Sequence, residues 1–331
     1  MADRETLYGK TPEELAALCG GMGMPRFAAR QIARWLYVRH TEDPLLMTDI
    51  AAVHRQRLAE RFAPAFNAPE RVTESADGTK KYLFRIPGGH AVESAYIPDG
   101  ERATLCVSSQ AGCRMGCKFC ATGRQGLQRS LTAAEILNQI VSLPERDKLT
   151  NIVFMGMGEP LDNTGEVLRA LEILTAEWGF GWSPTRITLS TAGVVPELRR
   201  FLDATKVHLA VSLHNPFHEE RAEIMPVERA WPVAEVAAIL REYDFTHQRR
   251  VSFEYIVMSG LNDFGFDCKA FAAGLQYEHP TVQQRFFALL RTCVLFMAEE
   301  GSVHIDDRNR ASYRMCREIA EQLKDHHLPC R

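Results

Sequence analysis

Three cysteines within eight residues constrain this chain more than any other feature: Cys113-Arg-Met-Gly-Cys117-Lys-Phe-Cys120. Three thiols so close in sequence can bind one metal centre only if the backbone turns tightly, and Gly112, Gly116 and Gly123 permit such turns. A structural zinc takes four ligands, and a conventional iron–sulfur cluster is held by four cysteines. The segment is therefore one ligand short of a closed site.

Our interpretation of the missing fourth cysteine is an iron with one open position, which can bind a substrate or cofactor directly. Two alternatives stay open. One is a zinc site completed by water or by a distant residue, for which Cys106 and His214 are candidates. The other is a set of free buried thiols.

The composition is that of a globular protein, with 46% hydrophobic and 24% charged residues. A chain of 331 residues is long enough for one large domain or two of ordinary size. It has no apolar run of about eighteen residues, so we expect no membrane span. The start, Met-Ala-Asp-Arg-Glu-Thr, lacks the pattern of a signal peptide, and nine cysteines, an odd number, fit a reducing compartment. We therefore expect a cytoplasmic location.

Residues 1–66 are predicted to form a small helical domain. Thr11-Pro12-Glu13-Glu14 has the pattern of a helix start, a second helix is expected over residues 25–38, and a third follows. Although the net charge of the chain is only −3, seven arginines stand against four acidic residues over residues 24–61. Arginine binds two phosphate oxygens at once, so this domain is our candidate for RNA contact. A solvated amphipathic face is the alternative.

Residues 67–102 are predicted to form a linker and a β-hairpin. The apolar period changes to two here, with strands over residues 81–86 and 91–97 joined by a turn at Pro87-Gly88-Gly89. Glu93 lies in the second strand between apolar residues, where such a carboxylate usually faces solvent.

From residue 103 to about 275, strands alternate with helices, which predicts a parallel sheet. A first strand is expected over residues 103–108. Further strands are expected over residues 151–155, 185–189, 207–211 and 251–257, and helices over residues 132–143, 163–178, 195–204 and 232–243. In a barrel, functional residues gather at the carboxyl ends of the strands. Three polar motifs lie there: Gly156-Met-Gly158-Glu159-Pro160, Ser190-Thr-Ala-Gly193 and Ser212-Leu213-His214-Asn215.

Together these motifs resemble the RlmN/Cfr family of radical S-adenosylmethionine (SAM) RNA adenine methyltransferases. The resemblance covers residues from about 12 to 275. Besides the cysteine segment, it rests on Thr104-Leu-Cys106, Phe154-Met-Gly-Met-Gly-Glu-Pro-Leu, Thr188-Leu-Ser-Thr-Ala-Gly, Ser212-Leu-His and Phe27-Ala-Ala-Arg30. It implies an α/β fold, a partial (βα)6 radical-SAM barrel with an N-terminal helical RNA-binding domain and a β-hairpin extension. It also implies a [4Fe-4S] cluster and SAM as cofactors, 23S rRNA and tRNA as substrates methylated on carbon 2 of adenosine, and an electron donor such as flavodoxin.

The resemblance also implies roles for individual residues. In this family the enzyme methylates its own cysteine, a 5′-deoxyadenosyl radical abstracts hydrogen from that methyl group, the carbon radical adds to the base, and a second cysteine resolves the adduct. Cys106 matches the resolving cysteine and Glu93 the proton acceptor; taken alone, Cys106 would be a buried strand cysteine. The cluster ligands are Cys113, Cys117 and Cys120, and the SAM contacts are Gly158, Glu159, Ser190, Ser212, Leu213 and His214.

The resemblance ends near Leu275, so residues 276–331 form a divergent C-terminal segment. The family's Asn-Pro motif, which contacts SAM, and its late Ala-Ala-Cys-Gly-Gln segment, which carries the methylated cysteine, have no counterpart. Cys293 and Cys316 lie in apolar patterns typical of core packing, which makes Cys330 our candidate for the methyl carrier. Two other functions stay open: a radical-SAM enzyme without methyl-cysteine chemistry, and a catalytically inactive RNA-binding iron–sulfur protein.

Overall fold

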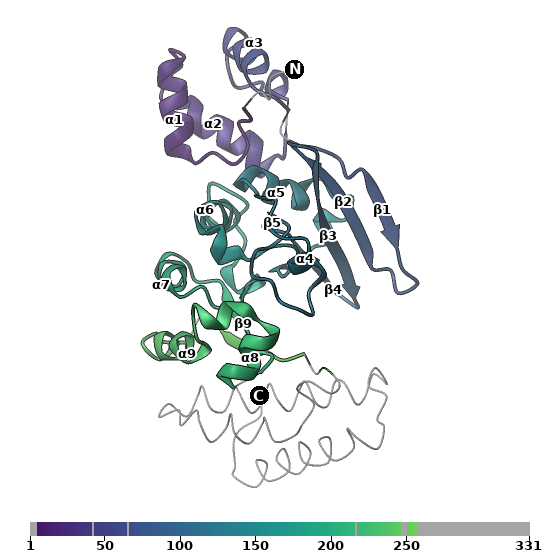
Figure 1. Ribbon diagram of the computed structural model, residues 1–331. Coiled ribbons are helices and arrows are strands. Elements are labelled where there is room, and N and C mark those ends of the chain that lie inside the picture. Colours follow the sequence, from purple (N-terminus) through teal and green to yellow (C-terminus); the bar gives the residue numbers. More distant parts are fainter. Residues whose placement is uncertain are drawn as a thin grey trace. The chain divides into compact units, whose positions relative to one another are not determined.

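The computed structural model describes residues 5–41, 43–64, 66–215, 217–245, 250–256 and 258. They divide into two compact units, whose elements are labelled in Figure 1. The first unit comprises the described residues up to Gly116 together with Cys120–Ser190 and Pro196–His208. The second comprises Cys117–Phe119, Thr191–Val195 and the described residues from Leu209 onward.

The first unit begins with short helices, as predicted: α1 (Pro12–Gly21), α2 (Ala28–Ala33) and α3 (Ala52–Arg61). At the start of α1, the hydroxyl of Thr11 accepts from the amide of Glu14, whose carboxylate accepts from the amide of Thr11 at 2.9 Å, which is a capping box. The second helix differs from the prediction. It begins later, because residues 26 and 27 form a turn, and it continues as a π-helix over Arg34–Val38.

Aromatic side chains join these helices to the rest of the first unit. The ring of Tyr37 lies 5.3 Å from that of Tyr8 and 5.7 Å from that of Trp178, centroid to centroid. Its hydroxyl donates to the carbonyl of Lys10 at 2.6 Å. An ion pair of 2.5 Å between Glu14 and Arg169, a residue of helix α6 (Thr164–Thr175), adds a polar contact. The helices at the start of the first unit are therefore packed against the rest of that unit and are not connected to it by the chain alone.

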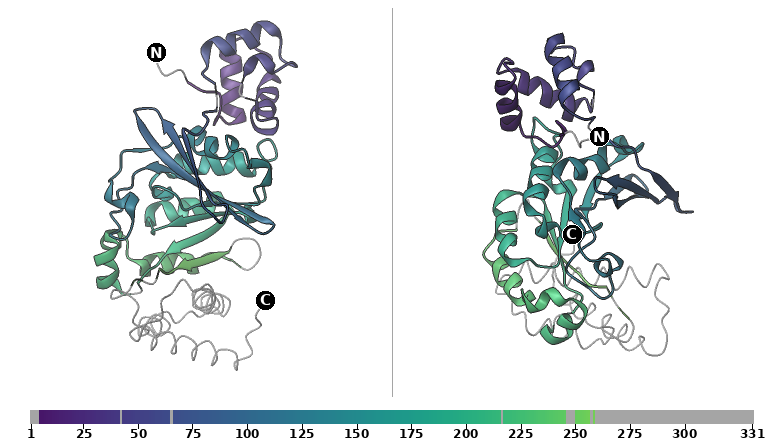
Figure 2. Two further views of the ribbon diagram at one scale, coloured as in Figure 1. Left: turned by 90° about the vertical axis from the view of Figure 1, so that its right-hand side faces the viewer. Right: turned by 45° about the horizontal axis from the view of Figure 1, so that its top comes forward.

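An antiparallel extension follows, with strands β1 (Arg71–Glu74), β2 (Lys80–Ile86) and β3 (His90–Asp99). The predicted hairpin of β2 and β3 is confirmed, and its turn holds Gly88 and Gly89 at φ of 85° and 80°, where glycine is unstrained. The sequence did not predict β1, because all four of its residues are exposed and no apolar alternation marks it. Figure 2 shows this extension reaching beyond the helices of the first unit.

The sheet continues in the order β1-β2-β3-β4-β7-β8, with β4 (Arg102–Cys106), β7 (Asn151–Phe154) and β8 (Ile187–Thr191). β4 is antiparallel to β3 but parallel to β7, and β7 is parallel to β8, so the predicted parallel alternation is confirmed. Helices α5 (Ala133–Val141) and α6 lie side by side (Figure 1), and α7 (Val195–Ala204) follows β8. β8 begins later than predicted because Pro184–Arg186 form a 3-10 turn.

The central strands have two unlike faces. One face is fully buried and forms the core of the first unit, with Val92, Leu105, Ile152, Phe154, Ile187 and Leu189. The other face is half-buried and carries Glu93, Cys106, Val153, Thr188 and Ser190. Side chains alternate between the faces of a strand, so this second face collects three predicted site residues of the first unit, Glu93, Cys106 and Ser190.

The second unit contains the parallel pair β9 (His208–Ser212) and β10 (Val251–Glu254), with helices α8 (His218–Ile224) and α9 (Val233–Arg241). A 3-10 helix, Pro226–Arg229, lies in the segment that connects α8 to α9. Helix α8 was not predicted. No helix in the described ranges combines the length and the apolar character needed to cross a membrane.

The packing of Tyr37 predicts a large effect on stability. Replacing Tyr37 by alanine removes a fully buried ring and its contacts, so we expect a loss of about 3–5 kcal/mol in the free energy of unfolding. Phe27→Ala is the matched control, because that ring is 62% exposed, and we expect a change within about 0.5 kcal/mol. Urea unfolding of the full chain measures both, and equal losses in the two variants would contradict this account of the packing.

Candidate functional site

The first part of the site is the contact between Ser108–Gln110, which come shortly after β4, and the Gly156–Glu159 loop that follows β7. The backbone amides of Ser109 and Gln110 donate to the carbonyl of Met157 at 2.8 and 3.1 Å. In return, the amide of Met157 donates to the hydroxyl of Ser108 at 2.8 Å, and the amide of Glu159 donates to Oε1 of Gln110 at 3.0 Å. These four bonds fix the loop against the segment that leads to the first cysteine.

Close approach explains the two glycines of this loop. A Cβ at position 156 would lie 2.7 Å from Oγ of Ser108. At position 158, where φ is +100°, it would lie 2.6 Å from Cβ of Gln110. Glu159 is only 4% exposed, and Oε1 of its side chain accepts from the amide of Leu161 at 3.0 Å. The loop therefore presents a buried carboxylate with fixed geometry at the carboxyl end of a parallel strand.

The cysteine segment starts at a tight crossing of the chain. Gly112 has a φ of +74°, and a Cβ there would lie 1.8 Å from the carbonyl oxygen of Gly126. The same carbonyl accepts from the amide of Cys113 at 3.2 Å. At the other end, Cys120 precedes helix α4 (Ala121–Arg124). Cys113 and Cys120 belong to the first unit, whereas Cys117 belongs to the second.

The surroundings of Cys113 favour a cation. Burial raises the pKa of the Cys113 thiol to about 11, and the charges of Glu159, Cys120 and Asp162 act in the same direction. A thiolate at this position therefore requires positive charge close by, which a bound metal supplies.

The three thiols fit the predicted cluster by the chemistry of the donor set, since cysteine thiolates are the usual ligands of iron–sulfur clusters. Among the described residues, no group of three or more cysteine, histidine or acidic side chains is gathered closely enough to count as a metal site. The assignment of Cys113, Cys117 and Cys120 as ligands thus stays a prediction that rests on the segment and on the surroundings of Cys113.

The half-buried sheet face carries three predicted site residues of the first unit. Cys106 in β4 is directly opposite Ala95 in β3, so Glu93, two residues from Ala95, shares the face of Cys106. Ser190 belongs to the same face, at the end of β8. Glu93 forms an ion pair of 3.0 Å with Lys81 and is 43% exposed, which agrees with the solvent-facing alternative. Cys106 is half-buried, more accessible than a core cysteine.

In the second unit, the turn after β9 holds Ser212, Leu213 and His214 together. The amides of Leu213 and His214 both donate to the carbonyl of Glu254, at 2.9 and 3.2 Å. His214 has a φ of 56°, unusual for a residue with a side chain. The ring of Phe119, from the middle of the cysteine segment, packs edge-on against the His214 ring at 4.9 Å. The structure thus brings three of the predicted SAM contacts into one turn next to the cysteine segment.

The environment of His214 fixes its charge and its tautomer. Burial, aided by the charge of Arg221, lowers the pKa of His214 to about 4, so the ring is neutral near pH 7. The amide of Ile256 donates to Nδ1 of His214 at 3.2 Å, which leaves the proton on Nε2. His214 is therefore neutral near pH 7 and carries its one N–H at Nε2.

Sequence reasoning missed two residues of this region. Arg221 is completely buried and bonds to the carbonyls of Ser212 and Leu213, but an arginine in an unpredicted helix gives no signal of burial. Glu254 lies opposite Ser212, and the hydroxyl of Ser212 donates to its carboxylate at 3.5 Å. Its position at a strand end, like that of the other polar motifs, could have marked it. Cys330, the predicted methyl carrier, lies outside the described residues.

The crossing at Gly112 predicts the effect of a single methyl group. In Gly112→Ala, the new Cβ would collide with the carbonyl of Gly126, so we expect the cysteine segment to shift and the bound iron per chain to fall by half or more after anaerobic reconstitution. Gly165→Ala is the control, because a Cβ there meets nothing within 4 Å. Iron and sulfide analysis with visible absorption measures both. Wild-type iron content in Gly112→Ala would show that this crossing does not hold the segment.

The lowered pKa of His214 predicts a dependence of stability on pH. The folded state binds this proton more weakly than the unfolded chain, so its contribution is complete above about pH 6.5 and is lost as the pH falls towards 4. Between pH 7.5 and 5.5 we expect the wild type to lose about 1 kcal/mol more stability than His214→Asn, which cannot titrate there. Asparagine tolerates the left-handed backbone. Urea unfolding at both pH values tests this, and identical losses in the two proteins would contradict it.

Comparisons with known proteins agree with this geometry. The Radical SAM superfamily model matches residues 107–267, and that of the ribosomal RNA large subunit methyltransferase N-terminal domain matches residues 6–63. A probable dual-specificity RNA methyltransferase RlmN from Bacteroides fragilis is 55% identical over 257 residues, 78% of this chain and 75% of that protein. The dual-specificity RNA methyltransferase RlmN of Syntrophotalea carbinolica is 44% identical over 80% of this chain and 72% of its own length.

A solved structure supports the same fold. The crystal structure of a radical SAM methyltransferase from Sphaerobacter thermophilus aligns with a TM-score of 0.76 at 39% identity, and the alignment covers 82% of each chain. The predicted radical-SAM fold, with its N-terminal helical domain, is thereby confirmed. On these matches and on the geometry of the strand ends, the chain belongs to the RlmN family of the radical SAM superfamily.

Proposed function

We propose that this chain is a radical-SAM RNA methyltransferase that methylates carbon 2 of adenosine in 23S rRNA and in tRNA. The observation that carries the proposal is that the described part of a chain belonging to the RlmN family contains the three predicted cluster cysteines and the six residues predicted to contact SAM. A relative from Porphyromonas gingivalis, 56% identical over 257 residues, carries the name of probable dual-specificity RNA methyltransferase RlmN.

Two bound groups belong to the proposal. Cys113, Cys117 and Cys120 would hold a [4Fe-4S] cluster, and Gly158, Glu159, Ser190, Ser212, Leu213 and His214 would contact SAM. When bound, the two groups together would supply a radical able to abstract hydrogen from a carbon atom. Such chemistry is needed because an adenine C–H carbon is too poor a nucleophile for direct methyl transfer from SAM. The protein's part is to orient SAM with buried groups of fixed geometry, the carboxylate of Glu159 and the neutral imidazole of His214.

Glu93 and Cys106 are proposed to act on the RNA base. They share the half-buried sheet face, as two residues that work on one base would have to. Cys106 would resolve the adduct between base and methyl carrier, and Glu93 would accept a proton. Lys81 holds the carboxylate of Glu93 through their ion pair. Cys330 is proposed as the methyl carrier, by the sequence argument alone.

RNA contact is proposed for the N-terminal domain, residues 1–66. Arg26, Arg30 and Arg34 are exposed, so their guanidinium groups can reach phosphate. The guanidinium of Arg39 stacks over the ring of Trp35 at 4.0 Å, a pair that can present a flat surface to a base. For the rest of the chain we propose a linker and hairpin extension over residues 67–102, a barrel over residues 103–275 and a divergent segment over residues 276–331.

We also propose that the protein is cytoplasmic and that its electron donor is a protein such as flavodoxin.

The test uses anaerobically reconstituted full chain with SAM, a reductant and 23S rRNA that lacks the modification. We expect both 5′-deoxyadenosine and 2-methyladenosine by mass spectrometry. Cys106→Ala is expected to lower 2-methyladenosine by about 100-fold or more and to keep 5′-deoxyadenosine formation, because SAM cleavage does not use this thiol. Cys19→Ala, at a buried cysteine far from the predicted motifs in sequence, is the control.

The other outcomes separate the alternatives. Formation of 5′-deoxyadenosine without 2-methyladenosine in the wild type would indicate a radical-SAM enzyme with other chemistry. Neither product, from a chain with a full cluster and salt-dependent RNA binding, would indicate an inactive binding protein. If methylation occurs, Cys330→Ala decides whether this cysteine carries the methyl group.

A further inference from the structure

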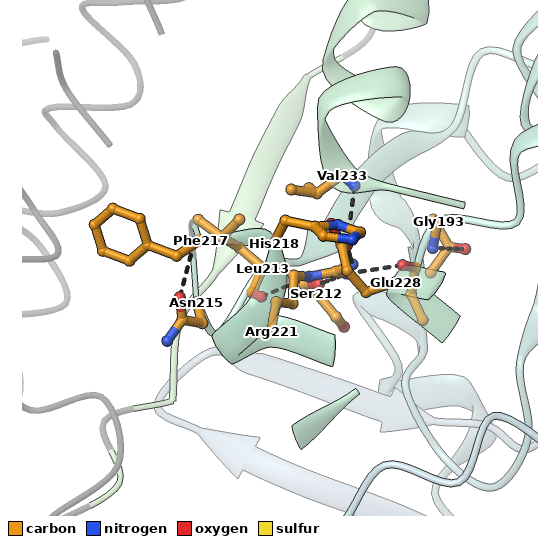
Figure 3. A network of polar contacts seen from close by, with 11 residues as sticks. Gly193, Ser212, Leu213, Asn215, Phe217, His218, Arg221, Glu228 and Val233 are labelled. Carbon is orange, nitrogen blue, oxygen red and sulfur yellow. Dashed lines mark hydrogen bonds and ion pairs between the residues drawn. The ribbon is translucent and has the colours of Figure 1, made fainter. Parts of the chain in front are cut away.

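A completely buried arginine lies at the centre of a polar network in the second unit (Figure 3). Arg221 of α8 donates from Nε to the carbonyl of Leu213 at 2.9 Å and from Nη2 to the carbonyls of Ser212 and Ala192, at 2.7 and 2.9 Å. The carbonyl of Ser212 belongs to the last residue of β9 and that of Leu213 to the residue after it. The carbonyl of Ala192 directly follows β8, two residues after Ser190. One guanidinium thus ties Ser212 and Leu213, two proposed SAM contacts, to the turn that begins two residues after Ser190, a third.

The guanidinium is itself held in place. Nη1 of Arg221 pairs with Oε2 of Glu228, which is 1% exposed. The same oxygen accepts from the amide of Val233, the first residue of α9, at 3.0 Å, and Oε1 of Glu228 lies 2.9 Å from Nδ1 of His218. The guanidinium group of Arg221 therefore has one orientation. Nη1 faces the carboxylate of Glu228, and Nε and Nη2 face the three carbonyl groups.

Stability alone does not explain a buried ion pair, because apolar residues of similar volume are often as stabilising. In this position, however, an apolar side chain would remove the donor that the three carbonyl groups share. The planar fork matches several acceptors at once, which lysine does with poorer geometry. Arg221 is therefore better explained by the shape that its hydrogen bonds give to the two turns.

Helix α8 also contacts the cysteine segment. The amide of Lys118 donates to the carbonyl of Ile224, the last residue of α8, at 2.9 Å. The residue after Lys118, Phe119, packs against the ring of His214. The middle of the cysteine segment and the SAM turn therefore share one support within the second unit.

We infer that Arg221 is a positioning residue for SAM: its guanidinium holds the turns at Ala192 and at Ser212–Leu213 in the shape that binds the cofactor. The inference rests on the proposed function, in which Ser212 and Leu213 contact SAM and so does Ser190, which directly precedes the turn at Ala192. It assigns to Arg221 no contact with the reacting atoms. Its loss should therefore weaken the binding of SAM more than it slows the reaction of bound SAM.

The test compares Arg221→Lys with Arg229→Lys, an exposed arginine of the neighbouring 3-10 helix, in cluster-loaded full chain. Anaerobic equilibrium dialysis with labelled SAM gives the dissociation constant, and 5′-deoxyadenosine formation at saturating SAM gives the maximal rate. For Arg221→Lys we expect a dissociation constant raised about tenfold or more with a maximal rate within about threefold of wild type. For Arg229→Lys we expect both to be unchanged. A folded Arg221→Lys protein that binds SAM like the wild type, or that loses only rate, would overturn the inference.

A second measurement needs no variant and decides the case if Arg221→Lys does not fold. Hydrogen exchange of the wild type, cluster-loaded and without SAM, should already show slow exchange at the amides of Gly193, Leu213 and His214, because the turns are held in advance. Fast exchange that becomes slow only when SAM is added would overturn the inference. A wild type that binds SAM but methylates no RNA contradicts the proposed function alone, since both measurements are made without RNA; one that binds no SAM overturns both.

Discussion

The first unit's part of the site depends on one interaction, the mutual hydrogen bonding between Ser108–Gln110, which come shortly after β4, and the Gly156–Glu159 loop. Cys113 follows Gln110 by three residues, so any shift of this contact would move the first predicted cluster ligand. The contact is also tied to the helical layer, because the side-chain amide of Gln139 in α5 bonds to both the amide and the carbonyl of Ser108, each at 2.9 Å. Buried polar groups satisfied in this reciprocal way fix a unique arrangement, since each alternative would leave a donor or an acceptor unpaired.

The sequence predicted the elements whose apolar pattern is strong. The parallel strands, helices α5, α6, α7 and α9, and the capping box of α1 all follow the prediction within a few residues, because alternation, buried runs and capping chemistry are local properties. The polar strand ends were also predictable, since the topology of an α/β fold places functional groups there. Ser190 and Ser212 were placed near strand ends in this way, whereas their assignment to SAM came from the family resemblance and stays a prediction.

The elements that were missed depend on tertiary contacts. β1 has no buried side chain and exists through its pairing with β2, which leaves no periodic signal. The charge pattern of α8 reads as a solvated surface, because Glu219, Glu220 and Arg221 are adjacent, yet Arg221 is buried and Glu219 is exposed. Only the fold tells them apart, since the partners of Arg221 come from two other turns and from Glu228. The π-helix at Arg34–Val38 likewise has no sequence signature that we recognise.

Left-handed backbone marks the turns after three successive strands: Gly158 after β7, Gly193 after β8 and His214 after β9, with φ of 100°, 104° and 56°. Two of these positions have the expected glycine. At the third, a histidine costs about 1 kcal/mol of backbone strain, which a glycine would avoid. The hydrogen bond from the amide of Ile256 to Nδ1 offsets part of that cost, but a buried ring that must stay neutral loses stability in acid as well. A glycine at position 214 would carry neither of these two costs. The neutral imidazole in this strained turn, beside the carbonyls to which Arg221 donates, supports the proposal that His214 contacts SAM.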